Sequence, residues 1–192
     1  MEAETRRKSG NGLYEWLRAL VCAVIAVVLA FTFTVRVVGV SGGSMRETLQ
    51  DQDRLVVVNR FWCGDYRPGD IVIVGGAFED RELIVKRVIA TAGQTVDIDF
   101  DGGTVYVDGA ALEEPYIRQQ THREEGTVFP LTVPEGCVFV MGDNRNDSRD
   151  SRDPVLGPVD TRAIIGRAVF LLLPGQTEDL EAREWSRIGI LK

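Results

Sequence analysis

The sequence predicts a mainly β fold behind one N-terminal transmembrane helix, with antiparallel sheets forming a sandwich or a partly open barrel. Three observations predict it. Sixteen uncharged residues run without a break at 20–35, near the N-terminus. After residue 42, short valine- and isoleucine-rich runs alternate with turns that contain glycine or proline, as in folds of many short strands. The chain also holds 20 glycines among 192 residues, which a fold with many turns requires.

Composition excludes several classes of function. The formal net charge of −7 argues against a nucleic-acid partner, because binding the phosphate backbone needs a basic face. The chain has a single histidine and no C-x-x-C motif, so we expect neither a metal site nor a cofactor. Cys63 and Cys137 are compatible with a disulfide in an extracytoplasmic domain and equally with two buried free thiols.

The uncharged run has the composition of a membrane-spanning helix. Extended to residues 17–40, it reaches bilayer length, provided that Arg18 and Arg36 extend to the two interfaces. Apolar residues occupy every face of the run, whereas a core helix of a soluble protein buries one stripe. A cleaved signal peptide is the competing interpretation, but the run is slightly long and no A-x-A-like cleavage site follows it.

Basic residues set the expected orientation of the anchor. Three of them, at 6–8, precede the span, and the positive-inside rule therefore places residues 1–16 in the cytoplasm. We expect a single-pass protein of the cell membrane, in contact with membrane lipid. Residues 41–192 then form a β-rich extracytoplasmic domain.

This domain is predicted to consist of short strands. We expect them at residues 53–59, 71–74, 83–90, 95–100, 104–107, 136–141 and 164–173. Residues 95–135 form a hairpin and a loop excursion, because an Asp-Gly-Gly turn joins two strands and residues 113–130 are polar and mixed. The acidic stretch 177–185 is expected to contain a short helix with Thr177 as its N-cap.

The first candidate for chemistry is the segment GDNRNDSRDSR at residues 142–152, directly after an apolar strand. A charged run is most often a solvated turn. Here the charges alternate in sign, so carboxylates and guanidinium groups can pair and fix a rigid loop. A rigid polar loop at a strand end is a common support for a functional site.

Lys86 is the second candidate, because it interrupts an apolar strand. Neighbouring side chains of a strand point to opposite faces, so Lys86 shares a face with Ile84 and Val88, opposite Arg87. If that face is core, burial lowers the lysine pKa by about 3–5 units, and a neutral amine becomes available as a general base. The alternative is an edge-strand lysine that discourages aggregation.

The segment Ser41-Gly42-Gly43-Ser44-Met45 lies between the anchor and the first strand. Its small residues fit either a linker or a nucleophile that is held close to a membrane. His122 lies in a polar segment and is expected to be a solvated loop residue, so a Ser-His-Asp triad is poorly supported. A Ser-Lys dyad needs no histidine.

In this order behind an anchor, Ser44-Met45, Lys86-Arg87 and the 142–152 box resemble bacterial type I signal peptidase of the compact single-anchor type. That family is the membrane-bound Ser-Lys endopeptidase that removes signal peptides from exported preproteins. The box matches the family pattern G-D-N-R-x-x-S-x-D-S-R at every fixed position. The segments Arg67-Pro68-Gly69-Asp70 and Ser186-Arg187-Ile188-Gly189 also look like family features.

The resemblance implies a role for each matching residue. Ser44 is the implied nucleophile and Lys86 the implied general base, with Ser148 orienting the lysine amine. The implied supporting residues are Asp150 and Arg152 as an ion pair, with Asp143 and Arg145. The implied substrates are signal peptides cut after small residues of the Ala-x-Ala type, with the export machinery nearby. The implied substrate-binding residues are Val38, Val40, Met45, Leu49, Ile84 and Val85.

The sequence departs from the family pattern at three places. Glu47 replaces the proline of S-M-x-P-T-L. Gly42 stands where many members carry a serine that donates to the oxyanion, so the oxyanion hole would rest on the backbone N–H of Ser44. After the lysine, Ala90, Ala92 and Gln94 replace the usual glycine, proline and acidic residue.

Two other functions compete with the peptidase. The related self-cleaving Ser-Lys repressors share the catalytic core, but they are soluble and carry a DNA-binding region, whereas this chain has an anchor and an acidic charge. A membrane-tethered, non-catalytic relative that binds exported chains is motivated by Glu47 and the loose lysine box. The joint presence of Ser44, Lys86 and Ser148 opposes it, because a binding module does not need that set.

Overall fold

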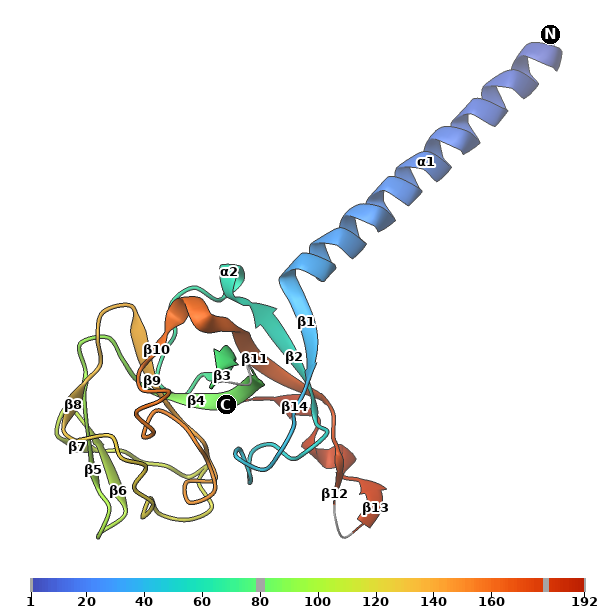
Figure 1. The fold of residues 1–192 in the computed structure, drawn as a ribbon. Helices are drawn as coiled ribbons and strands as arrows, with labels where there is room; N and C mark the ends of the chain where they lie inside the picture. The colour runs from blue at the N-terminus through green and yellow to red at the C-terminus, as the bar shows by residue number, and fades with distance from the viewer. Residues whose placement is uncertain (1, 79–81, 178–179, 192) are drawn as a thin grey trace. The chain divides into compact units, whose positions relative to one another are not determined.

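The computed structural model describes residues 2–78, 82–177 and 180–191. The chain forms two compact units, residues 1–35 and 36–192. The first unit is helix α1, Glu2–Thr34 (Figure 1). Its part Gly12–Thr34, 23 residues, is long and apolar enough to cross a membrane. At about 1.5 Å per residue it extends roughly 35 Å, against about 30 Å for a bilayer core.

The helix ends earlier than predicted. Residues 35–40 were expected to complete the membrane span, but Val35–Gly39 forms strand β1, which lies beside strand β2. The helical extension to residue 40 is therefore wrong. The valines of this stretch are β-branched and favour the extended backbone, and the glycine at its end is a poor helix former.

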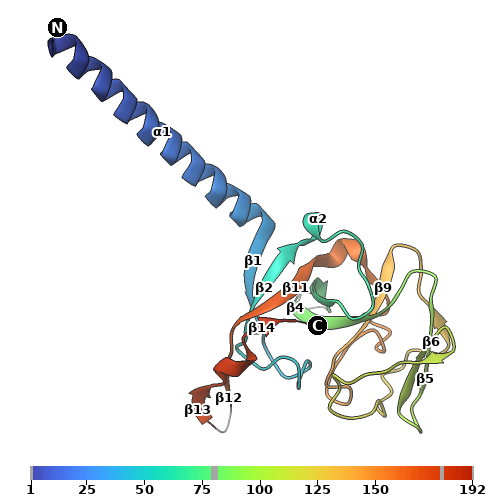
Figure 2. The ribbon, with the colours of Figure 1, turned by 180° about the vertical axis from the view of Figure 1, so that it is seen from behind.

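The second unit is built on an eight-stranded sheet with the order β1-β2-β11-β3-β4-β9-β10, in which β14 also pairs with β11 (Figures 1 and 2). Its remaining strands are β2 (Arg54–Asn59), β3 (Ile71–Ala77), β4 (Glu82–Thr91), β9 (Cys137–Met141), β10 (Val159–Asp160), β11 (Ile164–Leu173) and β14 (Gly189–Ile190). The pairings from β2 to β10 are antiparallel. The predicted mainly β, antiparallel class is confirmed, and the path of the large sheet ends in β1 and β10 without closing.

A four-stranded sheet with the order β7-β6-β5-β8 forms from the predicted excursion. Its strands are β5 (Thr95–Asp99), β6 (Thr104–Val107), β7 (Ala110–Ala111) and β8 (Leu131–Thr132). The predicted hairpin is confirmed as β5 and β6, and two short strands that were not predicted extend it. The remaining helical turns are α2 (Arg60–Cys63), η1 (Thr161–Ala163) and η2 (Trp185–Arg187).

The helix expected at residues 177–185 is wrong. The described part of this stretch pairs as two antiparallel strands, β12 (Gln176–Thr177) and β13 (Leu180–Arg183), and residues 178–179 lie outside the described chain. The two short segments on either side of residues 178–179 pair with each other. This pairing satisfies backbone groups of both segments instead.

The core lies on both faces of β3 and β4. Ile71, Ile73 and Val85 belong to one apolar cluster, and Val72 and Val88 to another. This division follows the two-residue period of a strand. Because β4 lies between β3 and β9, Lys86 is not an edge-strand residue, and that alternative is excluded.

The register of β4 and β9 places the start of the 142–152 box next to Lys86. Arg87 lies opposite Met141, the last residue of β9. The box begins at the next residue, Gly142, and thus leaves the sheet beside Lys86. Cys63 is buried, Cys137 is half-buried and both are free thiols, so the disulfide alternative is not realised.

Candidate active site

Lys86 is 2% exposed. Its Nζ donates a hydrogen bond to Ser148 Oγ at 3.0 Å, and Ser148 Oγ donates to Asp150 Oδ2 at 3.0 Å. Within the described residues, no ion pair includes Lys86. Burial lowers the pKa of Lys86 to about 8, although the charges of Asp150 and Glu125 act in the opposite direction.

The carboxylate of Asp150 is held by Arg152, and both side chains are fully buried. Arg152 donates from Nε to Oδ1 at 2.8 Å and from Nη2 to Oδ2 at 2.9 Å. The backbone N–H of Gly142 adds a bond to Oδ2 at 2.9 Å. Burial raises the pKa of Asp150, but the hydrogen bonds and charge of Arg152 outweigh burial and lower it. Asp150 is therefore an ionised, paired group beneath Ser148.

Asp143 pairs with Arg87 on the other face of β4. Arg87 donates from Nε to Oδ1 at 2.9 Å and from Nη2 to Oδ2 at 2.8 Å. Thr48 Oγ1 donates to the same Oδ2 at 2.5 Å. The ring of Tyr116 covers the guanidinium at 4.0 Å. Asp143 thus joins β4 to the segment that carries Ser44.

Arg145 holds the loop of residues 113–130 against the box. Its Nη1 donates to Thr121 Oγ1 at 2.9 Å and to Glu114 Oε2 at 2.8 Å, and its Nη2 pairs with Glu114 Oε1. Glu114 and Thr121 were not predicted. They lie in a polar stretch where nothing in the sequence distinguishes them from solvated neighbours.

Ser44 is half-buried in a loop that packs against the box. Its carbonyl oxygen accepts a hydrogen bond from Asn144 N at 3.0 Å, and Asn144 Nδ2 donates to Gly43 O at 3.0 Å. A Cβ at Gly142 would overlap both the Ser148 hydroxyl and the Ser44 carbonyl oxygen, so this close approach requires glycine. Among the described residues, no hydrogen bond joins Lys86 Nζ to Ser44 Oγ.

A buried ion pair closes the far end of this loop, and the sequence did not predict it. Arg187 donates to both oxygens of Asp53, at 3.1 and 2.7 Å. Arg187 Nη2 also donates to the carbonyl oxygen of Thr48 at 3.3 Å. Asp53 further accepts the backbone N–H groups of Gln50 and Gly175, at 2.8 and 2.7 Å.

A pocket of 280 Å³ lies beside Ser44. Its lining comprises Val40, Ser41, Ser44, Met45, Leu83, Ile84 and Val85, which includes four of the six predicted substrate-binding residues. The other two do not line it: Val38 is partly buried against the core and Leu49 is fully buried within it. Leu83 and Ser41 line the pocket and were not in the predicted set.

The residue that replaces the family's proline faces solvent. Glu47 is 66% exposed and lies 3.6 Å from the guanidinium of Arg118. His122 is exposed in its loop, as predicted, and its Nδ1 bonds to Phe100 O at 2.8 Å. Within the described residues, no group of three His, Cys, Asp or Glu side chains could hold a metal ion.

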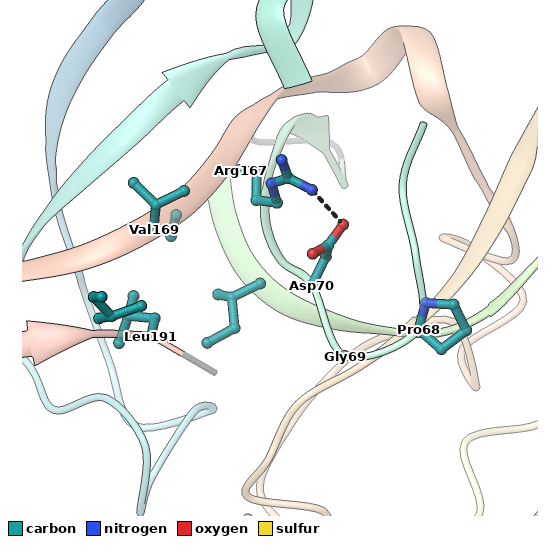
Figure 3. Close-up of a pocket in the computed structure, with 9 residues that line it drawn as sticks. Pro68, Gly69, Asp70, Arg167, Val169 and Leu191 are labelled. Atoms are coloured by element: carbon teal, nitrogen blue, oxygen red, sulfur yellow. Dashed lines mark hydrogen bonds and ion pairs between the residues drawn. The ribbon is translucent and has the colours of Figure 1, made fainter. Parts of the chain in front are cut away.

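A second hollow, of 370 Å³, lies between the turn before β3 and the strands β11 and β14 (Figure 3). An ion pair of 3.0 Å between Arg167 and Asp70 crosses its wall, and Val169 and Leu191 form its apolar side. It contains none of the predicted site residues.

Comparison with known proteins identifies the family of this chain. The family model described as "Signal peptidase, peptidase S26" matches residues 13–173. The chain belongs to the signal peptidase I family. A signal peptidase I from Bacillus licheniformis is 38% identical over 181 residues, covering 90% of this chain and 94% of the relative. Signal peptidase I T from Bacillus subtilis (strain 168) is 37% identical, covering 89% of this chain and 91% of the relative.

A crystal structure of a signal peptidase I from Enterococcus faecalis matches 55% of this chain and 97% of its own, with 29% identity and a TM-score of 0.46. The family match makes this chain a type I signal peptidase enzyme.

Proposed function

We propose that this signal peptidase is a serine endopeptidase in which Ser44 is the nucleophile and Lys86 is the general base. The observation that carries the proposal is the state of Lys86. Its amine is buried, its pKa is lowered to about 8, and it is oriented by Ser148 at 3.0 Å. An amine with such a pKa is available in its neutral form near physiological pH, as a general base must be.

In the proposed reaction, neutral Lys86 accepts the proton of Ser44 Oγ while this oxygen attacks the scissile carbonyl. The resulting ammonium returns the proton to the leaving amine, and an acyl-enzyme remains on Ser44. Lys86 then deprotonates a water that hydrolyses the ester. The bond from Lys86 to Ser148 fixes the direction of the lone pair. In uncomplexed enzymes the bond between nucleophile and base is often long and tightens only when substrate binds.

The backbone N–H of Ser44 is the proposed oxyanion donor. It has no acceptor among the described residues, so it is available to a developing oxyanion. Gly42 supplies no side-chain donor at the position where many family members carry serine. Losing one oxyanion donor costs about 10²–10³ in rate in other proteases, so this enzyme depends more heavily on the remaining donor.

The proposed substrates are exported preproteins with small residues of the Ala-x-Ala type before the cut. The pocket beside Ser44 supports this, because it is small, at 280 Å³, and five of its seven lining residues are apolar: Val40, Met45, Leu83, Ile84 and Val85. Residues 83–85 of β4 line its wall, and an extended peptide can add to such a strand through backbone hydrogen bonds.

The proposed topology places the N-terminal residues in the cytoplasm, helix α1 in the cell membrane and the β-rich catalytic domain outside it. The 23-residue apolar span supports the anchor, and the basic residues at 6–8 support the orientation. Contact with membrane lipid and proximity to the export machinery follow from this topology.

The test is cleavage of a preprotein that ends in Ala-x-Ala by the purified full-length enzyme in detergent. Ser44→Ala should lower kcat/KM by roughly 10⁴-fold or more, since no nucleophile remains. Ser186→Ala is the matched control, because Ser186 is exposed in η2 and should leave the rate unchanged. Undiminished cleavage by Ser44→Ala would exclude Ser44 as the nucleophile.

A further inference from the structure

The hairpin of β3 and β4 forms one wall of the pocket beside Ser44, because residues 83–85 line it. Strand β9 pairs with β4 only at residues 87–91, and β11 pairs with β3 only at residues 71–74. Among the described strands, residues 75–77 therefore pair only with β4, and residues 82–86 pair only with β3. The wall of the pocket thus belongs to the end of a hairpin that projects beyond the rest of the large sheet.

This projecting end is poorly supported by its own two strands. Their register is irregular between Val74 and Ala77, where the chain contains Gly75 and Gly76. Gly76 has a φ of 72°, a conformation that favours glycine. Because a two-stranded hairpin is marginally stable by itself, the position of the pocket wall depends on contacts from other parts of the chain.

Arg149 provides such a contact at the end of β3. Its guanidinium carbon lies 3.9 Å from the centroid of the Phe78 ring. Phe78 has a φ of 58°, and a bulky residue keeps this left-handed conformation only where its surroundings hold it. Arg149 is held in turn by an ion pair of 2.5 Å with Asp153, whose carboxylate also accepts the Val155 N–H at 2.8 Å. The end of the hairpin is thus fastened to the box and to the turn that follows it.

The same contact reaches both the pocket and Lys86. Phe78 and Ile84 pack against one apolar cluster, and Ile84 also lines the pocket. On the other side, Arg149 directly follows Ser148, which accepts the hydrogen bond of Lys86. Arg149 therefore links the wall of the pocket to the loop that orients the amine.

We propose that the contact between Arg149 and Phe78 sets the width of the pocket beside Ser44, which makes Arg149 a positioning residue for substrate specificity. This inference rests on the proposed peptidase function. While the contact holds, the wall at residues 83–85 stays in place and a small side chain before the cut fills the pocket. Without the contact, the end of the hairpin moves outward and a longer side chain fits. Arg149 occupies a variable position of the box pattern, so this role belongs to this chain and is not part of the family motif.

The test compares two synthetic peptides that differ only in the residue before the cut, which is alanine in one and 2-aminobutyrate in the other. The second side chain is longer by a single methylene, a difference that a fixed apolar pocket distinguishes. The full-length enzyme in detergent should prefer alanine. Arg149→Gln should lower the ratio of the two kcat/KM values about two- to fivefold, the equilibrium weight of an exposed cation–π contact. This ratio does not depend on the fraction of enzyme that is folded.

Matched variants separate this role from a general effect of the substitution. Arg162→Gln removes the arginine of another exposed ion pair, that with Asp160, and should leave the ratio unchanged. Phe78→Leu removes the ring and should lower the ratio as Arg149→Gln does, whereas Phe78→Tyr keeps the ring and should retain the wild-type ratio. The double variant of Arg149→Gln and Phe78→Leu should match either single variant, because both changes remove the same contact.

Each other outcome has a defined meaning. Slower cleavage of both peptides by Arg149→Gln at an unchanged ratio would show a purely structural role and overturn the proposal. An equal fall of the ratio in Arg162→Gln, or additive falls in the double variant, would overturn it as well, because the effect would then not come from this contact. If the wild type cleaved neither peptide in a Ser44-dependent manner, the proposed function would fail and this inference with it.

Discussion

Lys86 and Arg87 are neighbours on β4 and both are buried, yet among the described residues only Arg87 has a carboxylate partner. Arg87 meets Asp143 with two hydrogen bonds. Lys86 meets one neutral hydroxyl, that of Ser148. The nearby carboxylate of Asp150 is already paired with Arg152. Within the described chain, Lys86 therefore has no carboxylate of its own as a partner, because Arg152 pairs with the one nearby, and desolvation lowers the pKa of Lys86.

The largest effect is expected for Lys86→Met, which removes the buried charge and nearly keeps the length of the side chain. We expect kcat to fall about 10²–10⁴-fold, because the substitution removes the proposed general base. The free energy of unfolding at neutral pH should rise by up to about 3 kcal/mol, since the pKa of Lys86 is lowered from 10.5 to about 8 and each unit costs about 1.36 kcal/mol.

The pH dependence of stability provides the check. In the wild type, the folded enzyme holds fewer protons than the unfolded chain between pH 8 and 10.5, so the free energy of unfolding rises with pH across that window. Lys86→Met should lack this rise in urea titrations. A variant that cleaves normally, or that is destabilised throughout, would show that Lys86 is instead an ordinary structural cation.

The opposite result is expected for Arg87→Met. It leaves Asp143 buried without its partner, which typically costs about 3–5 kcal/mol. Urea denaturation at neutral pH measures the loss. Arg87→Lys is the matched variant, and it should recover only part of the stability because an ammonium cannot form the two parallel bonds. If Arg87→Met is as stable as Lys86→Met, the two faces of β4 do not differ as described.

Thr48 tests whether the Arg87–Asp143 pair supports the loop of Ser44, the proposed nucleophile. Thr48→Val removes the donor to Asp143 Oδ2 while retaining the shape of the side chain. A hydrogen bond to a charged group contributes about 1.5–3 kcal/mol, and we expect a loss of roughly tenfold in kcat with little change in KM. Thr48→Ser keeps the hydroxyl and should retain the rate. Equal kcat values for Thr48→Val and Thr48→Ser would show that the Thr48 hydroxyl does not contribute to catalysis.

The smallest effect concerns the pH profile. If neutral Lys86 is the base, kcat/KM should rise with pH through an apparent pKa of about 8. The charge of Glu125 raises the pKa of Lys86, and its Oε2 accepts the Asp150 N–H at 3.2 Å. Glu125→Gln keeps an acceptor but removes the charge, so the acid limb should move to lower pH. An acid limb at unchanged pH would show that the charge of Glu125 does not affect the apparent pKa of the reaction.

The strands and the apolar N-terminal helix could be predicted because their information is local. Runs of valine and isoleucine between turns located β2, β3, β4, β9 and β11 to within a few residues. Strands β12 and β13 were mistaken for a helix at residues 177–185, because local propensity competes there with pairing between two short segments. The end of α1 was misplaced for a similar reason: β1 gains a neighbour in the sheet.

Some residues of the candidate site could be predicted from the sequence and others could not. The 142–152 box and Lys86 stand out because polar residues interrupt or follow apolar strands. Glu114, Thr121 and the pair Asp53–Arg187 are polar residues in polar surroundings, and only long-range contacts reveal their partners. Lys86 and Arg87 are both buried, so the alternation of side chains along β4 did not by itself single out the lysine.

The loop that carries Ser44 is synthesised early, but residues much later in the chain hold it in place. Thr48 contacts Asp143 and Arg187, at sequence separations of 95 and 139 residues. A chain that ends at β9 contains both Ser44 and Lys86, yet it lacks Asn144, which contacts the Ser44 loop, and Ser148, which accepts the Lys86 hydrogen bond. The proposed Ser44–Lys86 site is therefore complete only after the box and the Arg187 segment have been synthesised.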